Sequence, residues 1–149
     1  MANIKKINLP KLPNDIVIEI LNNNINGRNE AFDNHPDEAL NFYKWVSANE
    51  KVQTWCKENI SQDIHWGIQI IEKDLPIHND LGTLAKFNYV IANGGNDVVT
   101  NFYDDEKTLI DSHNLELNQW YILNVEIYHN VQNIQKNSKR ISITGRIMP

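Results

Sequence analysis

Residues 87–103 read FNYVIANGGNDVVTNFY and decide the fold class. Two short runs of β-branched, apolar and aromatic residues flank Asn93-Gly94-Gly95-Asn96, whose glycines indicate a turn. Such runs, separated by Gly, Asn and Asp, are typical of β-strands. The same pattern extends over residues 63–149. We therefore predict that this part of the chain is built from strands.

Eight candidate strands follow from this pattern, with no helix expected between them. They are Trp66–Glu72, Leu75–His78, Phe87–Ala92, Val98–Tyr103, Thr108–Ile110, Trp120–Val125, Ile127–His129 and Arg140–Ile147. Two sheets that close on each other shield the edges of short strands. The sequence therefore predicts a jelly-roll core, also called a double-stranded β-helix.

The N-terminal region shows helical spacing instead. Ile16–Leu21 places apolar residues on one helical face, and Pro36 is expected to open a second helical segment that reaches Val46. Ser47–Glu50 reads as a capping box before a third helix, whose buried stripe lies within Val52–Ile60. We predict a single domain over residues 1–149, mainly β with N-terminal helices (α+β). Residues 1–62 would form a helical support and residues 63–149 the core.

Composition excludes several function classes. The 149 residues carry a formal net charge of -5, which argues against an electrostatic grip on nucleic acid. No run of about 18 apolar residues could span a membrane, and the N-terminal residues lack the apolar run of a secretory signal peptide. We therefore expect a cytoplasmic protein. Cys56 is the only cysteine, so metal binding would have to use His and carboxylate ligands.

Such ligands converge in one predicted arrangement. His78 and Asp80 are two positions apart in a strand-like stretch, so their side chains share a face. His129 ends a later predicted strand and could face them across the interior of a jelly roll. Two His and one carboxylate on one side of a metal are the ligand set of mononuclear non-haem iron(II) oxygenases. A single His on a strand is, however, more often a hydrogen-bonded structural residue.

The final predicted strand carries a second signal. Alternation places Arg140, Ser142, Thr144 and Arg146 on one face, opposite an all-isoleucine face. An inward Arg requires an anionic partner, because an unpaired buried charge is costly. Guanidinium binds a carboxylate through two parallel hydrogen bonds, and a nearby hydroxyl can add a third. This strand therefore indicates a site for a carboxylate ligand.

The sequence resembles the iron(II)- and 2-oxoglutarate-dependent oxygenase superfamily in one ordered pattern, which consists of His78-x-Asp80, His129 and Arg140-x-Ser142. The segment from Val125 to Val131 is similar to a branch of small hydroxylase-like oxygenases found in phage and marine bacterial genomes. The final strand also resembles the Arg-x-Asn-x-Thr-x-Arg strand of nucleic-acid demethylases, but Ser142 replaces the Asn.

The resemblance implies a set of roles. His78, Asp80 and His129 would be the catalytic iron(II) ligands, and Arg140 and Ser142 would hold the remote carboxylate of the co-substrate 2-oxoglutarate. Tyr89 and Tyr103 are further candidates for binding 2-oxoglutarate. The implied reaction couples oxidative decarboxylation of 2-oxoglutarate to hydroxylation by dioxygen. The substrate would be a peptidyl side chain, an amino acid or a small metabolite, with no membrane and no nucleic acid involved.

Two other functions remain open at this point. One is a cupin-type metal-binding protein with a non-oxygenase activity, in which Arg140 binds some other anion. The other is a non-catalytic jelly-roll binding module, in which the His and Asp residues come together by chance.

Overall fold

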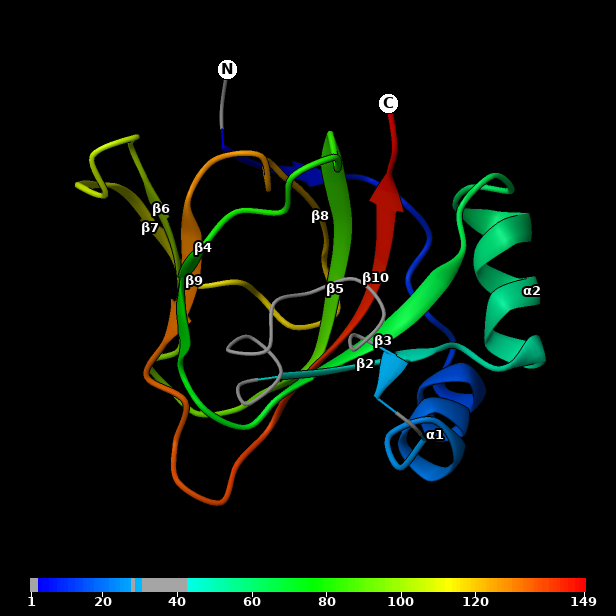
Figure 1. Cartoon of the computed structure of the whole chain (residues 1–149). Coiled ribbons are helices and arrows are strands. Elements are labelled where there is room, and N and C mark those ends of the chain that lie inside the picture. The colour runs from blue at the N-terminus through cyan, green and yellow to red at the C-terminus, as the bar shows by residue number, and fades with distance from the viewer. Residues whose placement is uncertain (1–2, 28, 31–42) are drawn as a thin grey trace.

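The computed structural model describes residues 3–27, 29–30 and 43–149. These residues form two helices and ten strands, and the strands are arranged in two antiparallel sheets (Figure 1). The large sheet has the order β1 (Ile4–Ile7), β8 (Trp120–Leu123), β5 (Ala85–Asn93), β10 (Arg140–Ile147), β3 (Trp66–Ile71), β2 (Tyr43–Ser47). The small sheet has the order β4 (Leu75–His78), β9 (His129–Gln132), β6 (Val99–Tyr103), β7 (Leu109–His113).

The eight strands from β3 to β10 form a jelly roll. β3, β10, β5 and β8 are neighbours in the large sheet, while β4, β9, β6 and β7 make up the small one. The chain therefore crosses repeatedly between two facing sheets, which is the double-stranded β-helix arrangement. This confirms the predicted fold class, mainly β with a jelly-roll core.

Two strands were not expected from the sequence. β1 pairs with β8 and β2 pairs with β3, so they extend the large sheet at its two ends. The predicted second helix is wrong over Tyr43–Val46, which lies in β2; residues 36–42 are outside the described residues. Pairing with β3 outweighs the three-residue spacing, because Tyr43 and Trp45 face the interior while Val46 packs in the core.

Strand bounds otherwise agree closely with the sequence, with one shift. Arg140–Ile147 and Leu75–His78 were predicted with the bounds that the structure shows. His129, however, begins β9 rather than ending a strand. The predicted glycine turn after β5 is also present, since Gly94 and Gly95 have φ values of 82° and 145°.

Helices α1 (Asn14–Asn23) and α2 (Glu50–Asn59) cover the outer face of the large sheet, on the side away from the small sheet (Figure 1). α2 begins after Asn49, whose side chain accepts a hydrogen bond from the Val52 N–H at 3.1 Å. A helix therefore begins in the predicted region, but the expected capping box is wrong, because Asn49 is the cap and Ser47 ends β2. Cys56 and Val52 are fully buried on the predicted stripe.

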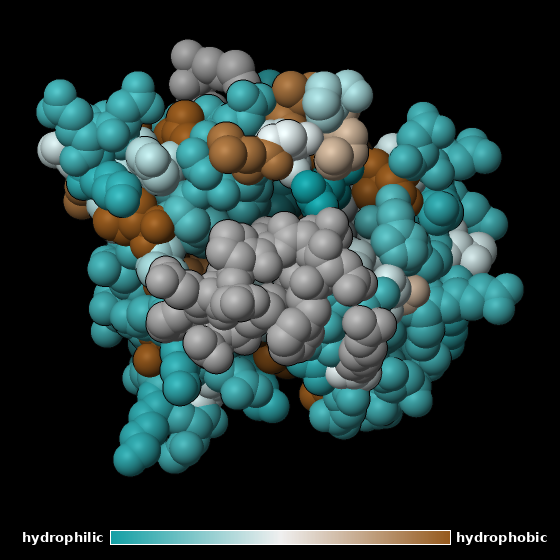
Figure 2. All heavy atoms as spheres, viewed as in Figure 1, coloured by the Kyte–Doolittle hydropathy of each residue, from teal (hydrophilic) through white to brown (hydrophobic). Residues whose placement is uncertain are grey.

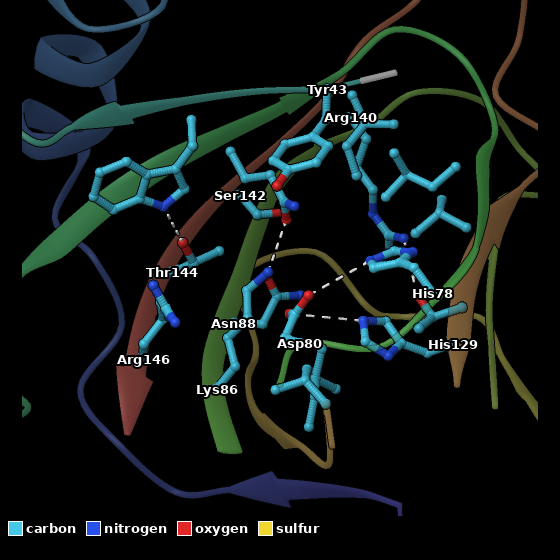
Figure 3. A pocket seen from close by; sticks show the side chains of 18 residues that line it. Tyr43, His78, Asp80, Lys86, Asn88, His129, Arg140, Ser142, Thr144 and Arg146 are labelled. Atoms are coloured by element: carbon cyan, nitrogen blue, oxygen red, sulfur yellow. Dashed lines mark hydrogen bonds and ion pairs between the residues drawn. The ribbon is translucent and has the colours of Figure 1, made fainter. Parts of the chain in front are cut away.

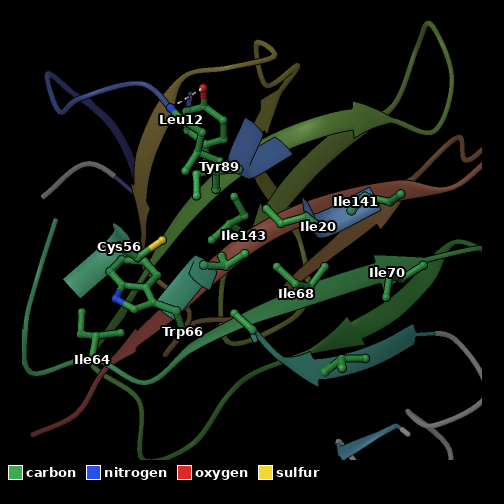
Figure 4. Close-up of a cluster of buried hydrophobic side chains, with 14 of the residues drawn as sticks. Leu12, Ile20, Cys56, Ile64, Trp66, Ile68, Ile70, Tyr89, Ile141 and Ile143 are labelled. Atoms are coloured by element: carbon green, nitrogen blue, oxygen red, sulfur yellow. Dashed lines mark hydrogen bonds between the residues drawn. The ribbon is translucent and has the colours of Figure 1, made fainter. Parts of the chain in front are cut away.

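The main core lies between these helices and the large sheet (Figure 4). Ile20, Ile68 and Ile143 have no measurable exposure there. Burying a side chain of this size contributes about 1.5–3 kcal/mol. Ile141 and Ile143 of β10 point into this core, so the alternate residues of β10 must face the small sheet.

Hydrophobic residues are concentrated in the interior. In the view of Figure 2 the described surface is mostly hydrophilic, with hydrophobic side chains in small separate groups. Among the described residues, no helix combines the length and the apolar composition needed to cross a membrane.

Candidate functional site

A pocket opens between the two sheets (Figure 3). Its cavity volume is about 80 Å³. The large sheet contributes Arg140, Ser142, Thr144 and Arg146, all on the face predicted from alternation. The small sheet contributes His129 and its neighbours. Side chains from both sheets can therefore reach one ligand.

His78, Asp80 and His129 meet in this pocket. His78 of β4 and His129 of β9 are paired in register, and Asp80 follows two residues after the end of β4. The His78 Nε2 atom lies 3.7 Å from Asp80 Oδ1, and His129 Nε2 lies 3.8 Å from Asp80 Oδ2. One ligand atom from each of the three residues lies within 4.8 Å of the others. Figure 3 shows Asp80 joined to both imidazole rings.

The sequence allowed His129 to face His78 across the interior, but the structure does not place the two rings in this way. They are side by side in the small sheet, with ring centroids 4.4 Å apart. The reason is that β4 and β9 are adjacent strands in the jelly-roll order. Close approach of the rings therefore depends on strand pairing and not on the distance between the sheets.

Backbone carbonyls orient both rings. His78 Nδ1 lies 2.7 Å from the Pro76 carbonyl oxygen, and His129 Nδ1 lies 2.8 Å from the Ile127 carbonyl oxygen. Each Nδ1 must carry the hydrogen, because a carbonyl oxygen can only accept. Each Nε2 then faces Asp80. A carbonyl that holds the far nitrogen of a ligand imidazole is the usual outer support of metal-binding histidines.

His129 is in the neutral form that binds metals. Its pKa is lowered from 6.5 to about 4, chiefly by burial and also by the nearby His78, while Asp80 acts in the opposite direction. An ion pair with Asp80 would require a protonated ring, which this pKa excludes near pH 7. The neutral ring of His129 and the carboxylate of Asp80 thus approach each other with no ion pair between them. A divalent cation can bind to both, so the residues present fit a metal.

Arg140 lies deeper in the same pocket, and its side chain is almost fully buried at 2% exposure. Its Nη1 donates to Thr100 Oγ1 at 3.0 Å, while its Nε has no hydrogen-bond partner. No carboxylate of the described residues forms an ion pair with it. Burial lowers the pKa of Arg140 to about 10. A buried guanidinium with so few partners among the described residues favours the binding of an anion.

Ser142 and Thr144 continue the polar face of β10. Both are buried, and the Trp45 indole N–H donates to Thr144 Oγ1 at 3.2 Å. Ser142 lies between Arg140 and Thr144 on this face and lines the pocket. Its hydroxyl is thus placed on the same wall as the Arg140 guanidinium.

The two tyrosines predicted to bind 2-oxoglutarate do not line the pocket. Tyr89 packs in the core on the other face of β5, where its hydroxyl accepts a hydrogen bond from the Leu12 N–H at 3.3 Å (Figure 4). Tyr103 donates to Asn130 Oδ1 at 3.0 Å. Asn130 alternates with the pocket residues His129 and Val131, so Tyr103 is on the outer face of the small sheet. Strand alternation therefore contradicts both assignments.

Sequence reasoning also missed pocket residues. Lys86 and Asn88 line the wall opposite the histidines, and Tyr43 reaches the pocket from β2. Burial raises the pKa of Tyr43, and Asp80 adds to this increase. The polar alternation of Lys86 and Asn88 with Phe87 and Tyr89 could have indicated their inward face. Tyr43 gave no such signal, because its segment was assigned to a helix.

Comparisons with known proteins found likeness in fold alone. No family model and no curated protein matches the sequence. One similar structure is an oxidoreductase of the 2OG-Fe(II) oxygenase family from Burkholderia pseudomallei, at 8% identity and a TM-score of 0.47, over 66% of this chain and 52% of that one. Another is oxalate oxidase, at 8% identity and a TM-score of 0.49, over 97% of this chain and 69% of that one. This chain thus spans about half the length of the first protein.

Proposed function

We propose that this protein is an iron(II)- and 2-oxoglutarate-dependent oxygenase. His78, Asp80 and His129 would hold the iron, while Arg140 and Ser142 would hold the remote carboxylate of 2-oxoglutarate. The observation that carries the proposal is a buried arginine that forms no ion pair with a carboxylate of the described residues, in the same pocket as a His-Asp-His cluster. The finer placement, among the small hydroxylase-like oxygenases, rests on the sequence alone.

The His-Asp-His cluster and Arg140 suit two different ligands. The cluster offers two imidazoles and one carboxylate, a donor set that suits iron(II) and would leave its remaining positions open. Arg140 offers a planar fork that matches a carboxylate. A ketoacid can serve the cluster and Arg140 at once, because one end can approach the metal while the other carboxylate pairs with the guanidinium.

The protein's own contribution is binding and orientation. Pro76 and Ile127 fix the two rings through their carbonyl groups, and Thr100 fixes one end of the Arg140 guanidinium. Leu75 and Val131 give the pocket an apolar wall that limits water. Iron(II) and 2-oxoglutarate would supply the oxidation of a C–H bond by dioxygen, with release of succinate and carbon dioxide.

Anaerobic spectroscopy tests the proposal. Adding iron(II) and then 2-oxoglutarate should produce a weak visible band near about 500 nm, as for a ketoacid chelated at a facial site. Admission of air should then release succinate. His129→Ala should remove both signals, whereas His65→Ala, outside the pocket, is the matched control and should keep them.

The alternatives predict different outcomes. Tight metal binding with no visible band and no succinate would favour a cupin-type metal protein with another activity. A protein that binds neither metal nor ketoacid would be a non-catalytic jelly-roll module. Either result would overturn the oxygenase proposal.

A further inference from the structure

Two more cations face the pocket at its mouth, away from Arg140. Lys86 of β5 and Arg146 of β10 are direct partners in the antiparallel register, and both line the pocket. Directly opposed residues have Cβ atoms about 4.5–5.5 Å apart, and like charges placed in this way destabilise a sheet. The pair therefore has a cost that the fold itself does not explain.

Both cations donate hydrogen bonds to neutral acceptors among the described residues. Lys86 Nζ donates to Gln69 Oε1 at 3.0 Å. Arg146 donates from Nε and Nη2 to the single hydroxyl of Thr83, at 3.0 and 2.7 Å. Both acceptors are neutral, and no ion pair joins either cation to a carboxylate of the described residues. Burial lowers the pKa of Lys86, and the charges of Arg146 and Arg140 lower it further against the influence of Asp80.

Arg146 is too far from Arg140 to share a small ligand with it, whereas the Lys86 side chain extends toward Gln69, the register partner of Ser142. Arg140 and Arg146 are six positions apart on one strand, or about 20 Å along its axis. A five-carbon diacid held by Arg140 extends over less than half of that length. Figure 3 accordingly shows Lys86 and Arg146 on the other side of Asp80 from Arg140.

The net charge of the pocket also favours the binding of an anion. Asp80 is the single carboxylate among the pocket-lining residues that the structure describes, against the three cations Lys86, Arg140 and Arg146. A divalent metal adds two positive charges, and a ketoacid dianion removes two. The pocket thus stays positive with both bound, in a chain whose net charge is -5. A positive pocket in an acidic protein selects anions.

We propose that Lys86 and Arg146 bind a carboxylate of the substrate, so that the substrate is a small carboxylic acid. The inference rests on the proposed function, because it treats the Arg140 end as occupied by 2-oxoglutarate. Thr83 links the two parts of the site: its hydroxyl holds Arg146 and its N–H donates to the Asp80 carbonyl at 3.2 Å. An acid at Arg146 would thereby be positioned beside the loop that carries Asp80.

Fluorine NMR tests the subsite without turnover. The probe is trifluoroacetate, titrated into protein loaded with zinc(II) and saturating 2-oxoglutarate, and trifluoroacetamide is its neutral counterpart. Trifluoroacetate should bind and the amide should not. Lys86→Met and Arg146→Gln should each raise the Kd of trifluoroacetate about tenfold, as expected for one lost charge-assisted hydrogen bond. Lys86→Arg should retain binding, and Lys57→Met on the exposed side of α2 is the control for loss of one positive charge.

The outcomes separate this inference from the proposed function. Equal binding of the amide, or no effect of Lys86→Met and Arg146→Gln, would refute the subsite. A loss of 2-oxoglutarate affinity in Lys86→Met as large as in Arg140→Met would assign these cations to the ketoacid and would also refute it. A protein that binds trifluoroacetate through Lys86 but never binds 2-oxoglutarate would retain the anion subsite and refute the oxygenase.

Discussion

Replacing Arg140 tests the co-substrate clamp most directly. Arg140→Met keeps the apolar stem and removes the guanidinium, so it removes two hydrogen bonds to the ligand carboxylate. Hydrogen bonds to charged groups contribute about 1.5–3 kcal/mol each, so the Kd of 2-oxoglutarate should rise by about two to four powers of ten. Arg140→Lys keeps the charge but loses one bond of the fork, and its Kd should rise by about one to two powers of ten.

Ser142→Ala provides the graded comparison. It removes one hydroxyl and leaves the ion pair intact, so the Kd should rise by about tenfold or less. The assay is calorimetry of 2-oxoglutarate binding with manganese(II) in place of iron(II). The affinity for manganese(II) alone should stay nearly constant across the three variants, since neither residue is a metal ligand in the proposed site.

Ligand-free stability provides an independent check on the same residue. In the unliganded protein Arg140 has one hydrogen bond, to Thr100, and a buried Nε without a partner. An unsatisfied buried group costs about 1–3 kcal/mol, so Arg140→Met should not lower the unfolding free energy and can raise it. Unaltered 2-oxoglutarate affinity in Arg140→Met, together with a large loss in Arg146→Gln, would show that the wrong arginine has been assigned. If neither variant loses affinity, the oxygenase reasoning fails.

Three further predictions concern the metal, pH and the core. Asp80→Ala should weaken manganese(II) binding by more than about a hundredfold in calorimetry, because it removes the anionic ligand; retained affinity would exclude the proposed ligand set. Because the pKa of His129 is lowered in the folded protein, its contribution to the unfolding free energy is fully present above about pH 6.5 and decreases toward pH 4. Urea unfolding of the metal-free protein across this range should show the decrease, and the decrease should be smaller in His129→Gln. Ile143→Ala should cost about 2–5 kcal/mol in urea unfolding, because it opens a cavity under the helices; a cost below about 1 kcal/mol would contradict its place in the core.

The sequence predicted best where strand alternation is strongest. In β10 every second residue is isoleucine or small and the others are polar, so both its bounds and its two faces could be assigned in advance. The short separation of His78 and Asp80 similarly indicated a shared ligand set. These features are local, since they depend on a period of two along a single stretch of chain.

Features that depend on pairing between distant segments could not be predicted in the same way. Tyr43–Ser47 becomes a strand because β3 offers it a free edge, which nothing within the segment reveals. Tyr89 was taken as a ligand residue because tyrosines on strands are common in such pockets, yet its position on β5 turns it toward Leu12. Strand neighbours and the resulting faces are decided by the whole sheet.

The location of the charged groups connects the fold to the proposed chemistry. The metal ligands belong to the small sheet and the loop after β4, whereas Lys86, Arg140 and Arg146 belong to the large sheet. Each wall concentrates groups that attract a ligand: a His-Asp-His cluster on one side, and on the other three cations that form no ion pair with a carboxylate of the described residues. A metal suits the first, and anions suit the second. The ligands proposed here would therefore bridge the two sheets, with the metal on the small sheet and the anions on the large one.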